Sequence, residues 1–169
     1  MRTNTKQSIT LIGMPGSGKS TIGRLVARRL NWNFVDLDDV IKEKDGKSHA
    51  EILEFDGEKT LLAREEAHTL GLVFSNLVFS PGGSIIYSPK AMEKLRSETR
   101  VIYLALPLPE IKKRLGKKIN DRGIVGLAKK GIEGLFKERA PQYKAAAHHT
   151  VDCLNLRKQE IVKRILQDA

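Results

Sequence analysis

The sequence contains very little cysteine and no long hydrophobic run. Its single cysteine, Cys153, excludes an intrachain disulfide and fits a reducing compartment. No apolar run is long enough to cross a bilayer, and no secretory signal opens the sequence. We therefore expect a cytoplasmic protein without a membrane partner.

Aromatic residues are also scarce, at 5% of the 169 residues, although the net charge is +10. Such a charge can indicate nucleic-acid binding, but here the basic residues are not interleaved with aromatic ones. Basic walls around a polyanionic small molecule, together with solvated Lys and Arg, explain the same charge. We expect no nucleic-acid partner.

Residues 13–20, Gly-Met-Pro-Gly-Ser-Gly-Lys-Ser, match the phosphate-loop pattern G-x-x-x-x-G-K-[S/T]. An apolar β-branched run at 8–12 predicts a strand before the loop, and 20–30 predicts a helix after it. Loop amides and the helix N-terminus favour an anion. We expect Lys19 to reach the β- and γ-phosphates of a nucleotide and the Ser20 hydroxyl to bind Mg²⁺. The expected nucleotide-binding residues are Gly16, Ser17, Gly18, Lys19, Ser20 and Thr21.

Further strands are expected at 32–35, 77–80, 101–106 and 150–152, alternating with helices. Ser48 and Glu51 have capping-box spacing before a helix at 49–55, with another helix at 58–70. Pro141 predicts a kink in a helix at 132–147, and residues 1–7 are expected to be a loose end. No linker or repeat divides the chain. This pattern predicts one domain, 1–169, with a three-layer α/β architecture around a parallel sheet.

Several polar segments allow two interpretations. Asp36 and Asp38 follow a strand, where ligands bind in open α/β sheets, but Asp38 or Asp39 also suits a helix N-cap. The two roles are compatible. Gly82-Gly83 can admit a ligand close to the backbone or form a simple turn. His68 lacks a partner motif and is expected to be a surface helix residue.

Residues 116–131 are basic, contain four glycines and show little periodicity. A loop of this length is either functional or disordered, and the functional version is a lid that closes on the nucleotide. The sequence lacks the Asn-Lys-x-Asp and Asp-x-x-Gly motifs of GTPases and is too short for a motor or helicase. A small-molecule kinase fits the length, the lid and the paired aspartates.

Four further segments carry recognisable motifs: residues 19–25, 34–38 (Phe-Val-Asp-Leu-Asp), 56–58 with Glu65, and 137–143 (Lys-Glu-Arg-Ala-Pro-Gln-Tyr). Residues 46–53 read Gly-Lys-Ser-His-Ala-Glu-Ile-Leu. On these segments the chain resembles the shikimate kinase family from about residue 8 to its end, and residues 46–53 resemble the family's Gly-x-Ser-Ile-x-Glu-Ile-Phe. The resemblance implies a P-loop, nucleoside-monophosphate-kinase-like fold with a five-stranded parallel sheet in the order 2-3-1-4-5. It implies ATP- and Mg²⁺-dependent phosphorylation of shikimate to shikimate 3-phosphate in aromatic amino acid biosynthesis, by a monomer.

The resemblance also assigns roles to single residues. Asp36 would help to hold Mg²⁺ through water, and Asp38 would bind the acceptor hydroxyls and take a proton. Arg122 would be the lid arginine that stabilises the transferring phosphoryl group. The remaining assignments are Arg114 along the adenine, Gly82 and Gly83 at the acceptor, and Arg139 at the acceptor's carboxylate. Lys19, Asp38 and Arg122 are thus the expected catalytic residues.

Three positions depart from the family pattern. Leu62 stands where the pattern has the first of two carboxylate-binding arginines, Ser84 replaces the third glycine of Gly-Gly-Gly, and Gly123 replaces the proline after the lid arginine. Arg64 cannot substitute for the missing arginine, because two residues along a helix turn its side chain by about 200°. Two alternatives stay open: another small hydroxy acid or polyol as acceptor, or a non-catalytic nucleotide-binding protein.

Overall fold

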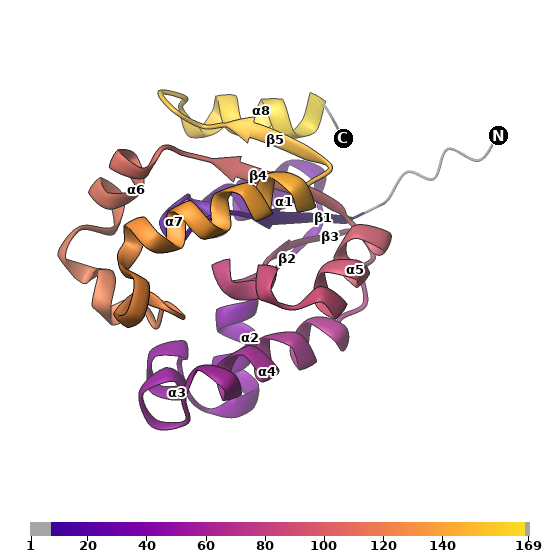
Figure 1. Ribbon diagram of the computed structural model, residues 1–169. Helices are drawn as coiled ribbons and strands as arrows, with labels where there is room; N and C mark the ends of the chain where they lie inside the picture. Colours follow the sequence, from indigo (N-terminus) through magenta and orange to yellow (C-terminus); the bar gives the residue numbers. More distant parts are fainter. Residues whose placement is uncertain (1–7, 168–169) are drawn as a thin grey trace.

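The computed structural model describes residues 8–167, so the expectation for residues 1–7 lies outside the described residues. Five strands form one sheet in the order β2-β3-β1-β4-β5, and every neighbouring pair is parallel. The strands are β1 (Ser8–Ile12), β2 (Asn33–Asp36), β3 (Leu77–Ser80), β4 (Arg100–Ala105) and β5 (His149–Asp152). This confirms the expected order 2-3-1-4-5 (Figure 1).

Helices cover both faces of this sheet. They are α1 (Lys19–Leu30), α2 (Leu37–Asp45), α3 (His49–Phe55), α4 (Glu58–Leu70), α5 (Pro89–Glu98), α6 (Leu108–Leu115), α7 (Leu127–Ala146) and α8 (Lys158–Gln167). Helix α1 packs with α8 on one face, while α5 and α7 lie along β4 on the other. The short helices α2 and α3 pack against α4 beside the β2 edge (Figure 1).

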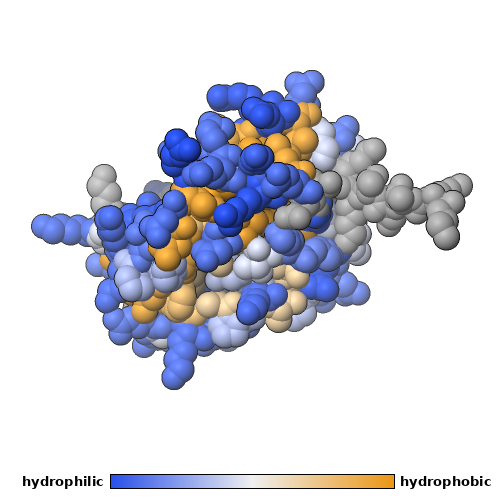
Figure 2. All heavy atoms as spheres, turned by 90° about the horizontal axis from the view of Figure 1, so that it is seen from above, coloured by the Kyte–Doolittle hydropathy of each residue, from blue (hydrophilic) through white to orange (hydrophobic). Residues whose placement is uncertain are grey.

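The core lies where the central strands meet these helices. Leu11, Val78 and Ile102 come from three adjacent strands and are completely buried, and every residue of β1 and β3 is buried, as expected for strands covered on both faces. The outer face above α8 and β5 is mainly hydrophilic, with smaller hydrophobic patches between the polar side chains (Figure 2). Among the described residues, no helix is both long and apolar enough to span a membrane.

Two expectations about the chain after α6 need correction. Residues 116–131 are not irregular throughout: Gly116–Arg122 form a 3₁₀ helix, and α7 already begins at Leu127. The break in α7 lies at Gly131, with φ 62°, and not near Pro141. Glycine adopts positive φ at little cost, and Gly131 has such an angle, whereas the dihedral angles at Pro141 stay helical. Residues 116–131 therefore consist of short helical pieces joined at glycines with positive φ.

A matched pair of leucines tests this description of the core. We expect Leu11→Ala to lower the free energy of unfolding by about 2–5 kcal/mol, because Leu11 is fully buried in the central strand. Leu154→Ala is the control, since Leu154 is 41% exposed and should change stability by less than about 1 kcal/mol. Urea unfolding of the two variants measures both values. Equal losses would contradict the assigned core.

Candidate active site

The phosphate loop joins β1 to α1 and lies at the carboxyl end of the sheet, where strand ends and helix N-termini meet. Gly18 is the N-cap of α1 with φ 96°, a conformation that favours glycine. The Lys19 Nζ donates to the carbonyl oxygens of Gly13, at 2.9 Å, and Met14, at 3.0 Å. The ammonium group is thus held inside the curve of the loop, next to the amides of the first turn of α1.

Lys19 is only 8% exposed. Burial lowers the pKa of Lys19 to about 8, against the opposing attraction of the Asp38 and Asp36 carboxylates. The cost of burying this ammonium group is therefore partly offset by two carboxylates across the cleft. An anionic ligand next to Lys19 would favour the charged form further.

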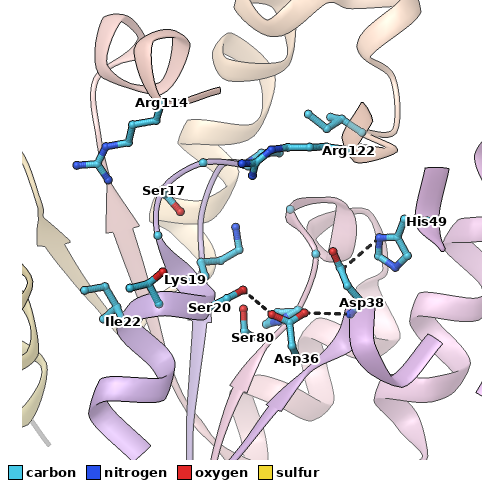
Figure 3. Close-up of a pocket in the computed structure, with 18 of the residues that line it drawn as sticks. Ser17, Lys19, Ser20, Ile22, Asp36, Asp38, His49, Ser80, Arg114 and Arg122 are labelled. Atoms are coloured by element: carbon cyan, nitrogen blue, oxygen red, sulfur yellow. Dashed lines mark hydrogen bonds and ion pairs between the residues drawn. The ribbon is translucent and has the colours of Figure 1, made fainter. Parts of the chain in front are cut away.

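Asp36 ends β2 and accepts hydrogen bonds from both α1 and α2. Its Oδ2 accepts a hydrogen bond from the Ser20 hydroxyl, and its Oδ1 accepts one from the Asp38 amide at 3.0 Å (Figure 3). Asp36 is therefore the N-cap of α2, so the expectation that Asp38 or Asp39 caps this helix was wrong. The cap lies two residues before Asp38 because the helix starts directly after the strand, at Leu37. One carboxylate thus both caps a helix and faces Ser20.

The oxygen atoms of Ser20 and Asp36 are donors of the kind that Mg²⁺ prefers. Nowhere in residues 8–167 do three or more His, Cys, Asp or Glu side chains form a metal-binding group. A Mg²⁺ ion here would take most of its ligands from phosphate oxygens and water, as is usual for this ion in nucleotide sites. The two donors therefore fit a nucleotide-bound Mg²⁺.

Asp38 lies on the first turn of α2 and points into the same cleft (Figure 3). The surrounding walls raise the pKa of Asp38 by desolvation, while His49 is the strongest opposing influence. The shift is limited by screening, because 59% of the side chain is accessible to solvent. Its Oδ1 lies 3.2 Å from the His49 Nδ1. Asp38 is thus positioned by an imidazole from α3.

At the far end of the cleft, Glu65 approaches the backbone of Gly82. A Cβ at Gly82 would lie 2.6 Å from the Glu65 Oε1, so any other residue there would require the Glu65 carboxyl group to shift. The Ser84 Oγ lies 2.8 Å and 2.6 Å from the two Glu65 oxygens. Burial raises the pKa of Glu65, and the Ser84 hydrogen bond opposes this. Ser84, which stands where the family pattern has a glycine, thus gives the buried Glu65 carboxyl group a hydrogen-bond partner.

Arg139 is buried at the same end, with 1% exposure. Its Nη2 donates to the Val125 carbonyl at 2.7 Å and its Nε to the Tyr87 hydroxyl at 3.0 Å, with the guanidinium 4.9 Å from the centre of the Tyr87 ring. No carboxylate in the described chain lies within ion-pair distance of Arg139. Buried charges are normally paired, so this guanidinium is prepared for an anionic ligand.

All the residues expected at the site line one cavity of about 1050 Å³. They are Gly16, Ser17, Gly18, Lys19, Ser20, Thr21, Asp36, Asp38, Gly82, Gly83, Arg114, Arg122 and Arg139. Arg122 extends from the segment after α6 over the phosphate loop, and Arg114 lies on the loop's other side (Figure 3). The Gly82-Gly83 segment borders this cavity, which favours the ligand interpretation over a simple turn.

The sequence interpretation missed several residues of the cavity wall. His49 follows the Ser48 cap of α3, and its proximity to Asp38 arises only from folding. The segment between β5 and α8 contributes Leu156, Arg157 and Lys158, which no motif indicated. The Ser48–Glu51 capping box, by contrast, is present as expected. This capping box was the only sequence feature that predicted His49 at the N-terminus of a helix.

The family model described as shikimate kinase matches residues 15–169. A shikimate kinase from Enterococcus faecalis is 34% identical over 163 residues, covering 95% of this chain and 97% of that protein. A solved shikimate kinase from Acinetobacter baumannii in complex with shikimate superposes with a TM-score of 0.87 and 30% identity, covering 96% of this chain and 92% of that one.

This chain belongs to the shikimate kinase family. It is therefore an ATP-dependent kinase whose acceptor group is a hydroxyl, and its nucleotide is used with Mg²⁺. The phosphate loop, Ser20 and Asp36 provide the matching donors in one cleft. The resemblance inferred from sequence motifs is confirmed.

Within this shikimate kinase family member, α4 carries the departure at Leu62. Leu62 lines a separate cavity of about 130 Å³ that shares Glu65 and Ser84 with the main one. Arg64 pairs with Asp45 at 3.0 Å, outside the cleft, in agreement with the expectation that it does not replace the missing arginine. His68 also binds Asp45, at 3.0 Å, and its side chain is 17% exposed. His68 is thus a partly buried structural residue rather than a freely solvated one.

The pKa of Lys19 predicts how nucleotide affinity changes with pH. With a pKa of about 8 in the free protein, Lys19 loses its proton as the pH rises through that value, so the ammonium group that binds phosphate is lost. We expect the Kd for Mg·ATP to rise between about pH 7.5 and about pH 9.5, measured by isothermal titration calorimetry. Lys19→Gln should bind weakly with a nearly flat profile. The same slope in both proteins would contradict the assignment to Lys19.

Proposed function

We propose that this chain transfers the γ-phosphoryl group of ATP to a hydroxyl of shikimate, giving shikimate 3-phosphate. The observation that carries the proposal is Arg139, a buried guanidinium in the same cleft as the phosphate loop that forms no ion pair with any carboxylate of residues 8–167. An acceptor that bears both a carboxylate and a hydroxyl satisfies Arg139 at one end and Asp38 at the other. Shikimate, the ligand named for the Acinetobacter baumannii enzyme, is such a compound.

In this proposal Lys19 and the loop amides of Gly16, Ser17 and Gly18 hold the triphosphate, with Ser20 and Asp36 as the residues that would hold Mg²⁺. Bound there, Mg²⁺ supplies charge neutralisation on the phosphate oxygens. Thr21 follows on the first turn of α1. Arg114 would lie along the base.

Asp38 would orient the acceptor hydroxyl and accept its proton as the oxygen attacks the γ-phosphorus. The bond from that phosphorus to the bridging oxygen of ADP breaks, and ADP leaves with the bond's electron pair. Arg122 would stabilise the charge on the transferring group, since it reaches over the phosphate loop. Gly82 and Gly83 would allow the acceptor to approach the backbone closely.

Residues 116–131 would act as the lid of a single domain that spans residues 1–169. This is supported by contacts at its far end, where the Gly126 amide donates to Glu58 at 2.9 Å and Lys129 lies 3.4 Å from the same carboxylate. A closed lid brings Arg122 over the phosphates and excludes water, which limits ATP hydrolysis. We further propose a cytoplasmic monomer that acts on a small molecule without a nucleic-acid or membrane partner.

A coupled assay with Mg·ATP and shikimate tests the proposal directly. We expect turnover by the wild type and its loss in Lys19→Ala. Arg139→Lys keeps the charge but loses the bidentate guanidinium, so the KM for shikimate should rise at least about tenfold while the KM for ATP changes little. An unchanged shikimate KM would contradict the role of Arg139. Tight ATP binding without transfer to any acceptor would favour a non-catalytic protein instead.

Leu62 favours the second candidate, a kinase for a smaller hydroxy acid or a polyol. If Leu62 weakens shikimate binding by removing one of two arginines, Leu62→Arg should lower the KM for shikimate by about tenfold or more. Ala63→Arg is the matched control, since it adds the same charge one position away. Equal KM values in the wild type and in Leu62→Arg would show that the missing arginine does not limit shikimate binding. Turnover of other hydroxy acids and polyols measures the alternative acceptors.

A further inference from the structure

Tyr87 and Glu138 form a hydrogen-bonded chain that ends at the buried guanidinium of Arg139. The Tyr87 hydroxyl accepts a hydrogen bond from the Arg139 Nε at 3.0 Å and donates one to the Glu138 Oε1. Lys130 pairs with the other oxygen of this carboxylate, Oε2. Tyr87, Glu138 and Lys130 do not line the cavity of the phosphate loop, whereas Arg139 does. Their effect on a ligand in that cavity therefore passes through Arg139.

The single proton of the Tyr87 hydroxyl decides the direction of this chain. The oxygen can accept a hydrogen bond from Arg139 only while its own proton points to another acceptor, and Glu138 is that acceptor. Burial and the hydrogen bond to Glu138 raise the pKa of Tyr87, and the contacts with Lys130 and Tyr87 lower the pKa of Glu138. Near neutral pH the phenol thus keeps its proton and the carboxylate keeps its charge. Glu138 therefore orients the hydroxyl, and the hydroxyl orients Nε.

The backbone explains why these side chains meet. Glu138 and Arg139 are consecutive on α7, so their side chains leave the helix about 100° apart. Tyr87 ends the 3₁₀ helix Gly83–Tyr87 and bridges the two. Lys130 lies eight residues before Glu138, which is about 12 Å along the axis of a straight helix. The break of α7 at Gly131 lets the two side chains pair.

The contacts of Arg139 fix which side of its guanidinium faces the cavity. The Nε donates to Tyr87 and the Nη2 to the Val125 carbonyl, so one edge of the planar group is held by two acceptors. The third nitrogen, Nη1, lies beside Gly83, where a Cβ would be 3.2 Å away. Gly83 lines the main cavity. The guanidinium thus presents its Nη1 side to the acceptor end of the cleft.

We propose that Tyr87 and Glu138 are positioning residues that hold Arg139 in the orientation which binds the acceptor's carboxylate; the inference rests on the proposed function. A planar guanidinium binds a carboxylate through two parallel hydrogen bonds only in one orientation of its plane. Without the Tyr87 hydroxyl, Nε loses its acceptor and the Val125 contact alone no longer fixes that plane. The carboxylate is then held less well, whereas the nucleotide, at the other end of the cleft, is unaffected.

Two conservative substitutions test the chain at separate points. Tyr87→Phe keeps the ring beside the guanidinium and removes the hydroxyl, and Glu138→Gln keeps the shape of the side chain and removes its charge. We expect Tyr87→Phe to raise the KM for shikimate about five- to tenfold and Glu138→Gln about three- to fivefold, with the KM for ATP within about twofold of the wild type in both. A coupled assay with Mg·ATP measures these values.

The chain offers a matched control for each substitution. Tyr103→Phe removes a phenolic hydroxyl from a ring that packs against Tyr143, and Glu133→Gln removes a carboxylate of α7 that pairs with Lys112. Neither residue forms a hydrogen bond with Tyr87 or Arg139. Both controls should leave the KM for shikimate within about twofold of the wild type. Melting temperatures of all variants report on folding.

An acceptor without a carboxylate separates positioning of Arg139 from a general structural effect. The probe is the shikimate analogue in which a hydroxymethyl group replaces the carboxylate. Since the proposed effect passes through the contact between Arg139 and the carboxylate, Tyr87→Phe should change the KM for this analogue by less than about twofold. In an Arg139→Lys background, Tyr87→Phe should likewise change the KM for shikimate by less than about twofold, because Nε is already absent.

A wild-type shikimate KM in both Tyr87→Phe and Glu138→Gln would overturn the proposal, and so would an equal rise of KM for shikimate and for its analogue. If Tyr87→Phe does not fold, Glu138→Gln still decides, since its side chain is partly exposed. Absence of wild-type turnover on shikimate would overturn the proposed function, and the role of Tyr87 and Glu138 with it. The wild type therefore distinguishes the two failures.

Discussion

The structure depends on the burial of one ammonium group among backbone oxygens and two carboxylates. Lys19 is held by the carbonyls of Gly13 and Met14 and faces Asp36 and Asp38 across the cleft. Each of these groups lies at the carboxyl end of β1 or β2, or in the loop or first helical turn that follows the strand. The parallel sheet order is what brings them together, because β1 and β2 both flank β3 and end at the same edge.

At the acceptor end of the cleft, the buried charged groups are held by neutral hydrogen-bond partners and not by groups of opposite charge. Its charged groups, Arg139 and Glu65, are both almost fully buried, and neither pairs with the other in an ion pair. Glu65 is instead stabilised by Ser84, and Arg139 by a backbone carbonyl and the Tyr87 hydroxyl. Neutral partners hold these groups in place, and no carboxylate among residues 8–167 forms an ion pair with the guanidinium of Arg139. Such an arrangement favours an anionic ligand over a closed internal salt bridge.

The segment from Gly116 to Gly131 connects the two ends. It carries Arg122 above the phosphate loop, contacts α3 near His49, and reaches the start of α4 through Glu58. A movement of this segment would therefore alter the nucleotide end and the acceptor end together. The close packing of this segment on α3 requires a glycine after Arg122. A Cβ at Gly123 would lie 2.4 Å from the backbone nitrogen of Ala50.

Local signals in the sequence were sufficient for the alternating strands and helices and for the phosphate loop, whereas the strand order 2-3-1-4-5 was expected from the family resemblance. Three features depend only on residues close in sequence and can therefore be predicted from it. They are the strand–loop–helix around Lys19, the capping box at Ser48, and the alternation of strands and helices. The predicted strand ends differ from the observed ones by no more than one residue. The break in α7 was predicted at Pro141 because the sequence shows a proline there, whereas it does not show the positive φ of Gly131.

Only the tertiary structure decided how the acceptor end is built. The pairing of His49 with Asp38, the approach of Glu65 to Gly82 and the isolation of Arg139 from carboxylates join residues from separate elements. No spacing rule reports such contacts, because they depend on how α3, α4 and α7 pack against the sheet edge. The sequence alone therefore determined that a phosphate is bound and that the chain is a kinase, whereas packing determined which groups face the molecule that receives the phosphate.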